Sequence, residues 1–248
     1  SNTAHLRPKN SVIQTAFTMC ALPNRVLLST AYFAPVEYFA VLDNCSNMVI
    51  EACEQYQKQS YRTRCHILTG SGVLVLTLPV LRGGGSVACS VTGSVTGNIT
   101  LDPTHKLPIS DIRIDYSKPW VLQHERAIEA AYGNSPFFEY YKDEIFAVLD
   151  SHIETLLGLN MELTSLLCEL CGIEKRFSLS TEYENPQKTE PDTLDLRSAI
   201  HPKVSVSNNP FYKEKAYYQV FTNKYGFTPN LSILDLLFNE GPNSVSFL

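Results

Sequence analysis

Trp120 and His124 have the residue types and the spacing that a catalytic site requires. They are four residues apart, so they lie on one face of the helix predicted for residues 117–132. A histidine titrates near neutral pH and can act as a general acid or base, and an indole beside it suits a sugar or another ring. We therefore predict His124 as a catalytic residue and Trp120 as a substrate contact. The structural alternative is a histidine that only packs and hydrogen-bonds.

A second cluster, residues 54–65, mixes acidic, amide, aromatic and basic side chains between two apolar stretches. Residues 61–68 are predicted as a strand, which places Arg62 and Arg64 on one face and Tyr61 and Cys65 on the other. Two arginines on one face can bind a carboxylate or a phosphate, or they can be solvated and paired with nearby acids. The predicted substrate-binding residues are Tyr56, Lys58, Tyr61, Arg62, Arg64 and Trp120.

The cysteines indicate reduced thiols and no metal site. There are seven of them, irregularly spaced, as expected for a reducing compartment. Cys168 and Cys171 share one face of a leucine-rich helix and have no second ligand pair, so core packing explains them. No metal and no cofactor are predicted. A Cys65–His124 thiolate pair is kept as a weaker alternative, which would make the protein a cysteine-dependent transferase or hydrolase.

Composition narrows the classes of partner. The chain has 248 residues, 44% of them hydrophobic, and a net charge of −5, with no basic stripe that would bind nucleic acid. The most apolar windows have the length of strands, so no membrane span is predicted. The first residues lack the order of a signal peptide. These observations predict a cytoplasmic protein that binds a small molecule.

The order of predicted elements indicates an α/β or α+β fold. Strands are predicted at residues 25–30, 48–53, 61–68, 73–80 and 109–116, and helices at 35–42, 117–132, 135–150, 153–170 and 232–238. We expect a mixed β-sheet from the N-terminal half, covered by helices from the middle and C-terminal parts. Residues 1–24 are predicted as an N-terminal extension. Residues 25–248 are predicted to form one domain, with a Gly/Ser/Thr-rich insertion at 82–108 that repeats Ser-Val-Thr-Gly.

Several of these segments together resemble the WbqC-like protein family. The resemblance is carried by Trp120, His124 and residues 32–39, 54–65, 78–80, 112–115, 131–141 and 231–240, and it spans nearly the whole chain from residue 25 onward. It implies a cytoplasmic protein associated with bacterial surface-polysaccharide gene clusters of the O-antigen type. The implied substrate is an amino sugar or a nucleotide sugar.

The resemblance implies an enzyme of surface-polysaccharide biosynthesis, and transfer of an acyl or aminoacyl group to an amino sugar is compatible with that context. A non-catalytic ligand-binding or assembly protein of the same pathway is the alternative. The chain also departs from its relatives. Residues 28–31 replace a His-Gln-Pro, Thr63 stands where an asparagine is common, and Glu51 is not followed by a second acid. Any role that rests on those missing groups does not transfer to this chain.

Overall fold

The computed structural model describes residues 22–81, 107–174, 176–206 and 209–248. Of the predicted N-terminal extension, residues 1–21 lie outside the described residues. Of the predicted insertion, residues 82–106 do as well. The predicted fold class is confirmed, because strands and helices combine in an α/β or α+β arrangement.

A parallel sheet of four strands forms one part of the fold. Its strand order is β5-β2-β1-β6, with β1 at Arg25–Ser29, β2 at Met48–Glu51, β5 at Phe177–Leu179 and β6 at Thr193–Asp195. The helix α1 (Val36–Asn44) makes the crossover from β1 to β2. The apolar runs of β1 and β2 are almost wholly buried, as expected for parallel strands covered on both faces.

The ends of these strands meet at one edge of the sheet. Ser29 of β1 is level with Glu51 of β2, and Leu27 is level with Asp195 of β6. After β1 the chain crosses to β2 on one side, while β6 lies on the other side of β1. Ligands of open parallel sheets bind outside the carboxyl ends of the strands at such a switch point. We therefore expect a binding site at this edge.

An antiparallel hairpin forms the second β element. It joins β3 (Arg64–Thr69) to β4 (Gly72–Thr77). Gly72 adopts a φ of 106°, a backbone conformation that would be strained for a residue with a side chain. The prediction that this strand begins at residue 61 is wrong. The amide of Thr63 donates to the carbonyl of Ser60 in a turn, so Arg62 precedes the strand and does not share its face with Arg64.

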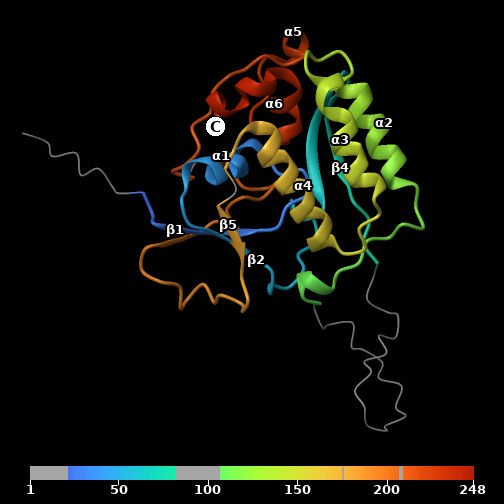
Figure 1. The fold of residues 1–248 in the computed structure, drawn as a ribbon. Helices are drawn as coiled ribbons and strands as arrows, with labels where there is room; N and C mark the ends of the chain where they lie inside the picture. Colours follow the sequence, from blue (N-terminus) through green and yellow to red (C-terminus); the bar gives the residue numbers. More distant parts are fainter. Residues whose placement is uncertain (1–21, 82–106, 175, 207–208) are drawn as a thin grey trace, which may run out of the picture.

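The helices agree with the prediction more closely than the strands do. The segments α2 (Trp120–Tyr132), α3 (Phe138–Asp150), α4 (Leu156–Cys171) and α6 (Ile233–Glu240) match four predicted helices. The described residues also form the short helix α5 (Thr222–Tyr225) and the 3-10 helices η1 (Ile109–Asp111) and η3 (Gly241–Phe247). Figure 1 shows the parallel sheet at the lower left and the α2–α3 pair at the right, with the β3–β4 hairpin and α4 between them.

The prediction of a strand at residues 109–116 is wrong. The segment begins as η1 and then makes only isolated bridges, from Arg113 to Thr155 and from Ile114 to Val80. Its alternation of apolar and polar residues arises because Ile112 and Ile114 enter the core while Arg113 stays exposed. Among the described helices, none has the length and apolarity to cross a bilayer.

Candidate functional site

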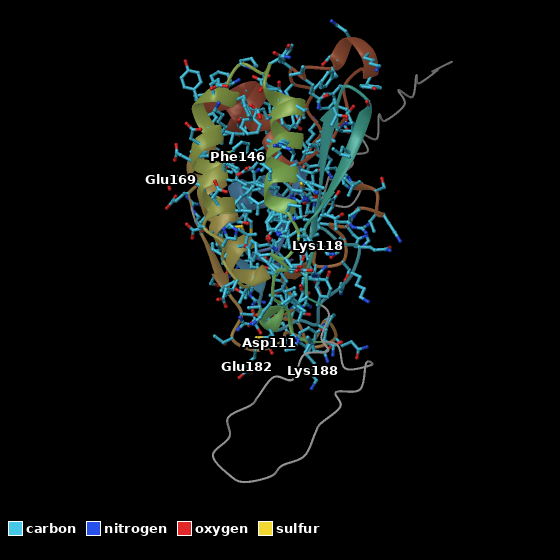
Figure 2. The ribbon with its side chains drawn as sticks, turned by 90° about the vertical axis from the view of Figure 1, so that its right-hand side faces the viewer. Asp111, Lys118, Phe146, Glu169, Glu182 and Lys188 are labelled. Atoms are coloured by element: carbon cyan, nitrogen blue, oxygen red, sulfur yellow. The ribbon has the colours of Figure 1, made fainter. Side chains whose placement is uncertain are left out.

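A polar cavity of about 500 Å³ lies beyond the carboxyl ends of β2 and β6. Its volume is within the range of small-molecule sites. Figure 2 shows Glu182 and Lys188, from the β5–β6 connection, at the same end of the molecule as Asp111, and the cavity residues Tyr183 and Pro186 lie between them in sequence. The lining comes from three segments: Cys53, Glu54, Gln55, Tyr56 and Gln57; Tyr183 and Pro186; and Asp195, Arg197 and Ser198.

Arg197 joins the ends of two strands at the cavity wall. Its Nη1 donates to Oε2 of Glu51 at 3.0 Å, and its Nε and Nη2 donate to the two carboxylate oxygens of Asp195 at 2.9 and 2.7 Å. Burial acts to raise the pKa of the Asp195 carboxyl, but the hydrogen bonds from Arg197 outweigh it and lower that pKa. Asp195 is therefore ionised at neutral pH.

The carboxylate of Glu51 is fully buried and organises the surrounding loops. Its Oε1 accepts hydrogen bonds from the hydroxyl of Ser180 at 2.5 Å and from the amide of Cys53 at 2.8 Å. Its Oε2 accepts from the amide of Glu184 at 3.0 Å. One side chain at the end of β2 thus fixes the segments that follow β2 and β5, and both of these segments line the cavity.

A second buried ion pair lies beside the cavity. Nε and Nη2 of Arg62 donate to the two carboxylate oxygens of Glu54 at 2.6 and 2.7 Å, and its Nη1 donates to Oε1 of Gln57 at 3.4 Å. Asn160 donates to the carbonyl of Arg62 at 2.9 Å. Arg62 is 1% exposed and Glu54 is 4% exposed, so the pair is part of the interior.

An aromatic ring covers the outer side of Arg197. The guanidinium carbon lies 5.4 Å from the ring centre of Tyr183, in cation–π geometry. Together with the two ion pairs, the cavity wall holds the carboxylates of Glu51, Glu54 and Asp195 against the guanidinium groups of Arg62 and Arg197. The excess carboxylate favours a ligand with a positive charge.

Of the predicted site residues, Tyr56 lines the cavity, and Arg62 contacts it through Glu54 and Gln57. Lys58 is exposed on the same loop. Tyr61 and Arg64 lie at the start of the hairpin and are not among the lining residues. Trp120 and His124 are brought together, as predicted, but inside the core.

His124 occupies a buried aromatic cluster. Its Nδ1 lies 2.8 Å from the hydroxyl of Tyr32, and its ring meets Trp120 edge-on at 5.2 Å. Burial lowers its pKa to about 4, although a hydrogen bond with the backbone of Thr77 acts in the opposite direction. The imidazole is 5% exposed and neutral at physiological pH. These contacts suit the packing role, while its role in proton transfer stays a prediction.

We expect nuclear magnetic resonance titration to show His124 neutral down to about pH 5, with an apparent pKa about 4. Because its folded pKa lies below that of an unfolded histidine, this group contributes stability that is complete above about pH 6.5. The contribution is lost as the pH falls through 4. The histidine nitrogen shifts of His124→Gln and wild type assign the resonance. Titration of His124 near pH 6.5 would contradict the burial argument.

Comparisons with known proteins identify the protein family of this chain. The model of the WbqC-like protein family matches residues 30–210 and 201–247, a span that includes every residue lining the cavity. The chain belongs to the WbqC-like protein family. It is 26% identical over 230 residues to the uncharacterized protein Rv1507c of Mycobacterium tuberculosis (strain ATCC 25618 / H37Rv), covering 85% of this chain and 91% of the relative. No solved structure matches it.

Three main residues of this WbqC-like cavity were not among the predicted site residues: Glu51, Asp195 and Arg197. A local signal was available for Glu51, which directly follows the apolar residues of β2 and ends that strand, where a carboxylate faces the carboxyl edge of a parallel sheet. Asp195 and Arg197 carry no such signal, because only one apolar residue precedes Asp195 in β6. The position of Arg197 is set by its pairing with Glu51, which is 146 residues away in the chain.

The structure also bears on the cysteine and metal alternatives. Cys65 is 1% exposed, and burial raises the pKa of its thiol well above the ordinary value. A thiolate is therefore unfavourable there, and the cysteine-dependent mechanism loses its nucleophile. Within the described ranges, His, Cys, Asp and Glu form no group of three or more that could hold a metal ion.

Proposed function

We propose that this WbqC-like protein is a cytoplasmic enzyme of bacterial surface-polysaccharide biosynthesis that transfers an acyl or aminoacyl group to an amino sugar. The observation that carries the proposal is the set Glu51–Arg197–Asp195 in the wall of the polar cavity. The resemblance to proteins of O-antigen type gene clusters supports the pathway. The relative from a bacterium is consistent with it.

The charges of the cavity suit an amino sugar as the acceptor. The protonated amine of such a sugar would neutralise the excess negative charge of the carboxylates, with Asp195 as its partner. Tyr56 and Tyr183 supply ring surfaces of the kind that pack against sugars. A neutral sugar of the same size would leave the excess charge uncompensated. The cavity therefore favours an amine over a hydroxyl at the reacting position.

The transfer step follows from the same groups. The ammonium releases one proton to solvent while Asp195 holds the amino group by a hydrogen bond, and the neutral amine nitrogen attacks the carbonyl carbon of an activated acyl donor. The new C–N bond forms as the donor's leaving group departs, and the second amine proton leaves for solvent. Arg197 uses three of its five N–H groups on Glu51 and Asp195. The other two are available to stabilise the developing oxyanion.

The direct test is a binding and turnover screen. Amino sugars and their nucleotide-linked forms should raise the melting temperature of the full chain, whereas N-acetylated and neutral sugars should not. Mass spectrometry of mixtures with acyl-coenzyme A or aminoacyl donors should show an N-acylated sugar. Equal binding of amino and neutral sugars, or no binding of either, would overturn the proposal.

Tyr183→Ala should weaken amino-sugar binding about fivefold, because it removes the ring that packs at the cavity wall. Its side chain is 54% exposed, so the free energy of unfolding should change by about 0.5 kcal/mol or less. Titration calorimetry measures the affinity. Tyr140→Ala is the matched control, since Tyr140 is 75% exposed on α3 and does not line the cavity. An equal loss in both variants would show that the effect is not local.

A non-catalytic binding or assembly protein is the second candidate. It is favoured by one observation, that Arg62 and Arg197 both form ion pairs with carboxylates of the protein itself. The same screen separates the two functions, because a binding protein would show the shift in melting temperature without any N-acylated product.

A further inference from the structure

Arg64 is a partly buried arginine for which the described residues supply no carboxylate. It begins β3, on the face opposite Cys65 and Ile67, which enter the core. Its Nε is buried and has no hydrogen-bond partner among the residues that the structure describes. Buried N–H donors in native proteins are almost always paired with protein groups, water or a ligand, so the Nε of this partly buried arginine is open to an acceptor from a ligand.

The other arginines show how unusual this is. Within the described ranges, five of them hold a carboxylate: Arg25, Arg62, Arg113, Arg176 and Arg197. Arg126 is exposed on α2, where solvent satisfies its guanidinium. Arg64 alone, among the described arginines, combines partial burial with the lack of an acid. The sequence pairs it with Arg62, but Glu54 already neutralises that neighbour.

The surroundings of Arg64 supply further donors and little negative charge. His66 lies two residues along the same face of β3, and its pKa is lowered first by burial and then by the charge of Arg64. The ring of Tyr61 meets that of His66 edge-on at 5.6 Å, and burial raises the pKa of its phenol, which keeps the hydroxyl proton. Across the hairpin, the partners of Arg64 and His66 are the uncharged Thr77 and Val75.

Glu37 is an acid near this cluster, and its charge adds to the rise in the pKa of the Tyr61 phenol. Its Oε1 accepts a hydrogen bond from Asn230 at 2.9 Å, and burial raises its pKa. No ion pair joins Glu37 to Arg64 in the described structure. Among the described residues, no acid forms an ion pair with Arg64.

We propose that Arg64, together with His66 and Tyr61, binds the oxygen atoms of a phosphate or carboxylate group at the start of the hairpin. The guanidinium supplies two parallel N–H donors that match such a group, and the imidazole and phenol add neutral donors beside it. The site is separate from the cavity lining. It does not rest on the proposed transfer reaction, because an anion can bind here whether or not the cavity acylates an amino sugar.

The test uses the full chain and three simple salts at constant ionic strength: inorganic phosphate, acetate and chloride. The backbone and imidazole resonances of His66 report binding in nuclear magnetic resonance titrations. We expect phosphate or acetate to saturate with a Kd of roughly 1 mM, and chloride to cause no saturable shift. Phosphate alone would identify a phosphate group as the ligand chemistry, and acetate alone a carboxylate. Absence of saturation with either anion would overturn the proposal.

Arg64→Met should lower the affinity for the anion about tenfold or more. Arg64→Lys should lower it about fivefold, because lysine keeps the charge but not the paired donors. Arg126→Met is the control, since it removes an exposed arginine outside the site. Its affinity should stay within about twofold of wild type. Thermal melting confirms that each variant is folded, and Arg64→Lys keeps the test open if Arg64→Met unfolds. Wild-type affinity in both Arg64 variants would exclude the site.

Discussion

Arg62→Ala should lower the free energy of unfolding by about 3–5 kcal/mol. The substitution leaves the carboxylate of Glu54, which is 4% exposed, without the two charge-assisted hydrogen bonds that now hold it at 2.6 and 2.7 Å. Urea denaturation followed by circular dichroism measures the loss. The same variant should disorder the cavity wall at Gln57, which Arg62 also contacts.

A second variant separates the ion pair from the volume of the side chain. Arg62→Met with Glu54→Leu removes both charges and keeps much of the packing, so it should recover most of the lost stability. A single-variant loss of less than about 1 kcal/mol would mean that water reaches Glu54, as it does at exposed pairs. A double variant as unstable as Arg62→Ala would assign the effect to shape.

Asp235 should make stability fall between pH 4 and pH 8. Asp235 is 1% exposed, and its carboxylate accepts hydrogen bonds from the neutral groups of Tyr217, Gln219 and Tyr132. Burial raises its pKa from 3.8 to about 6. Because the folded pKa exceeds the unfolded one, its contribution is complete below about pH 4 and is lost as the pH rises through 6. A shift of this size corresponds to about 3 kcal/mol.

The comparison with Asp235→Asn isolates this effect, since asparagine does not titrate. The difference in free energy of unfolding between wild type and the variant should change by about 3 kcal/mol between pH 4 and pH 8, with wild type relatively weaker at pH 8. Denaturation at a series of pH values measures it. A constant difference would show that Asp235 is ionised in the fold at both pH values.

The helices could be predicted because their end signals are local. Pro119 precedes α2, Thr155 caps α4 by accepting from the amide of Gly158, and Gly172 ends α4 in the left-handed region at a φ of 75°. The edge strands β5 and β6 could not be predicted. Each has three residues, and a polar stretch separates them, so they are strands only because β2 and β1 pair with them.

The site was predicted in part for the same reason. The mixed loop that contains Tyr56 and Arg62 stands out in composition, and the structure places it at the cavity. Arg197, which lines the same cavity, has no distinctive neighbours in sequence. Conversely, Trp120 and His124 carry a clear helical spacing, yet that spacing says which face they share and not whether the face meets solvent or the core.

The parallel sheet also governs the order in which the chain can fold. Strands β1 and β2 lie close together in the chain, but β5 and β6 follow β2 more than a hundred residues later. On the ribosome, the pair β1–β2 would wait with both of its edges open, a state that is slow to resolve and prone to aggregate. The ion pair of Glu51 with Arg197 then closes a loop of 146 residues, so the cavity exists only once the last strand has docked.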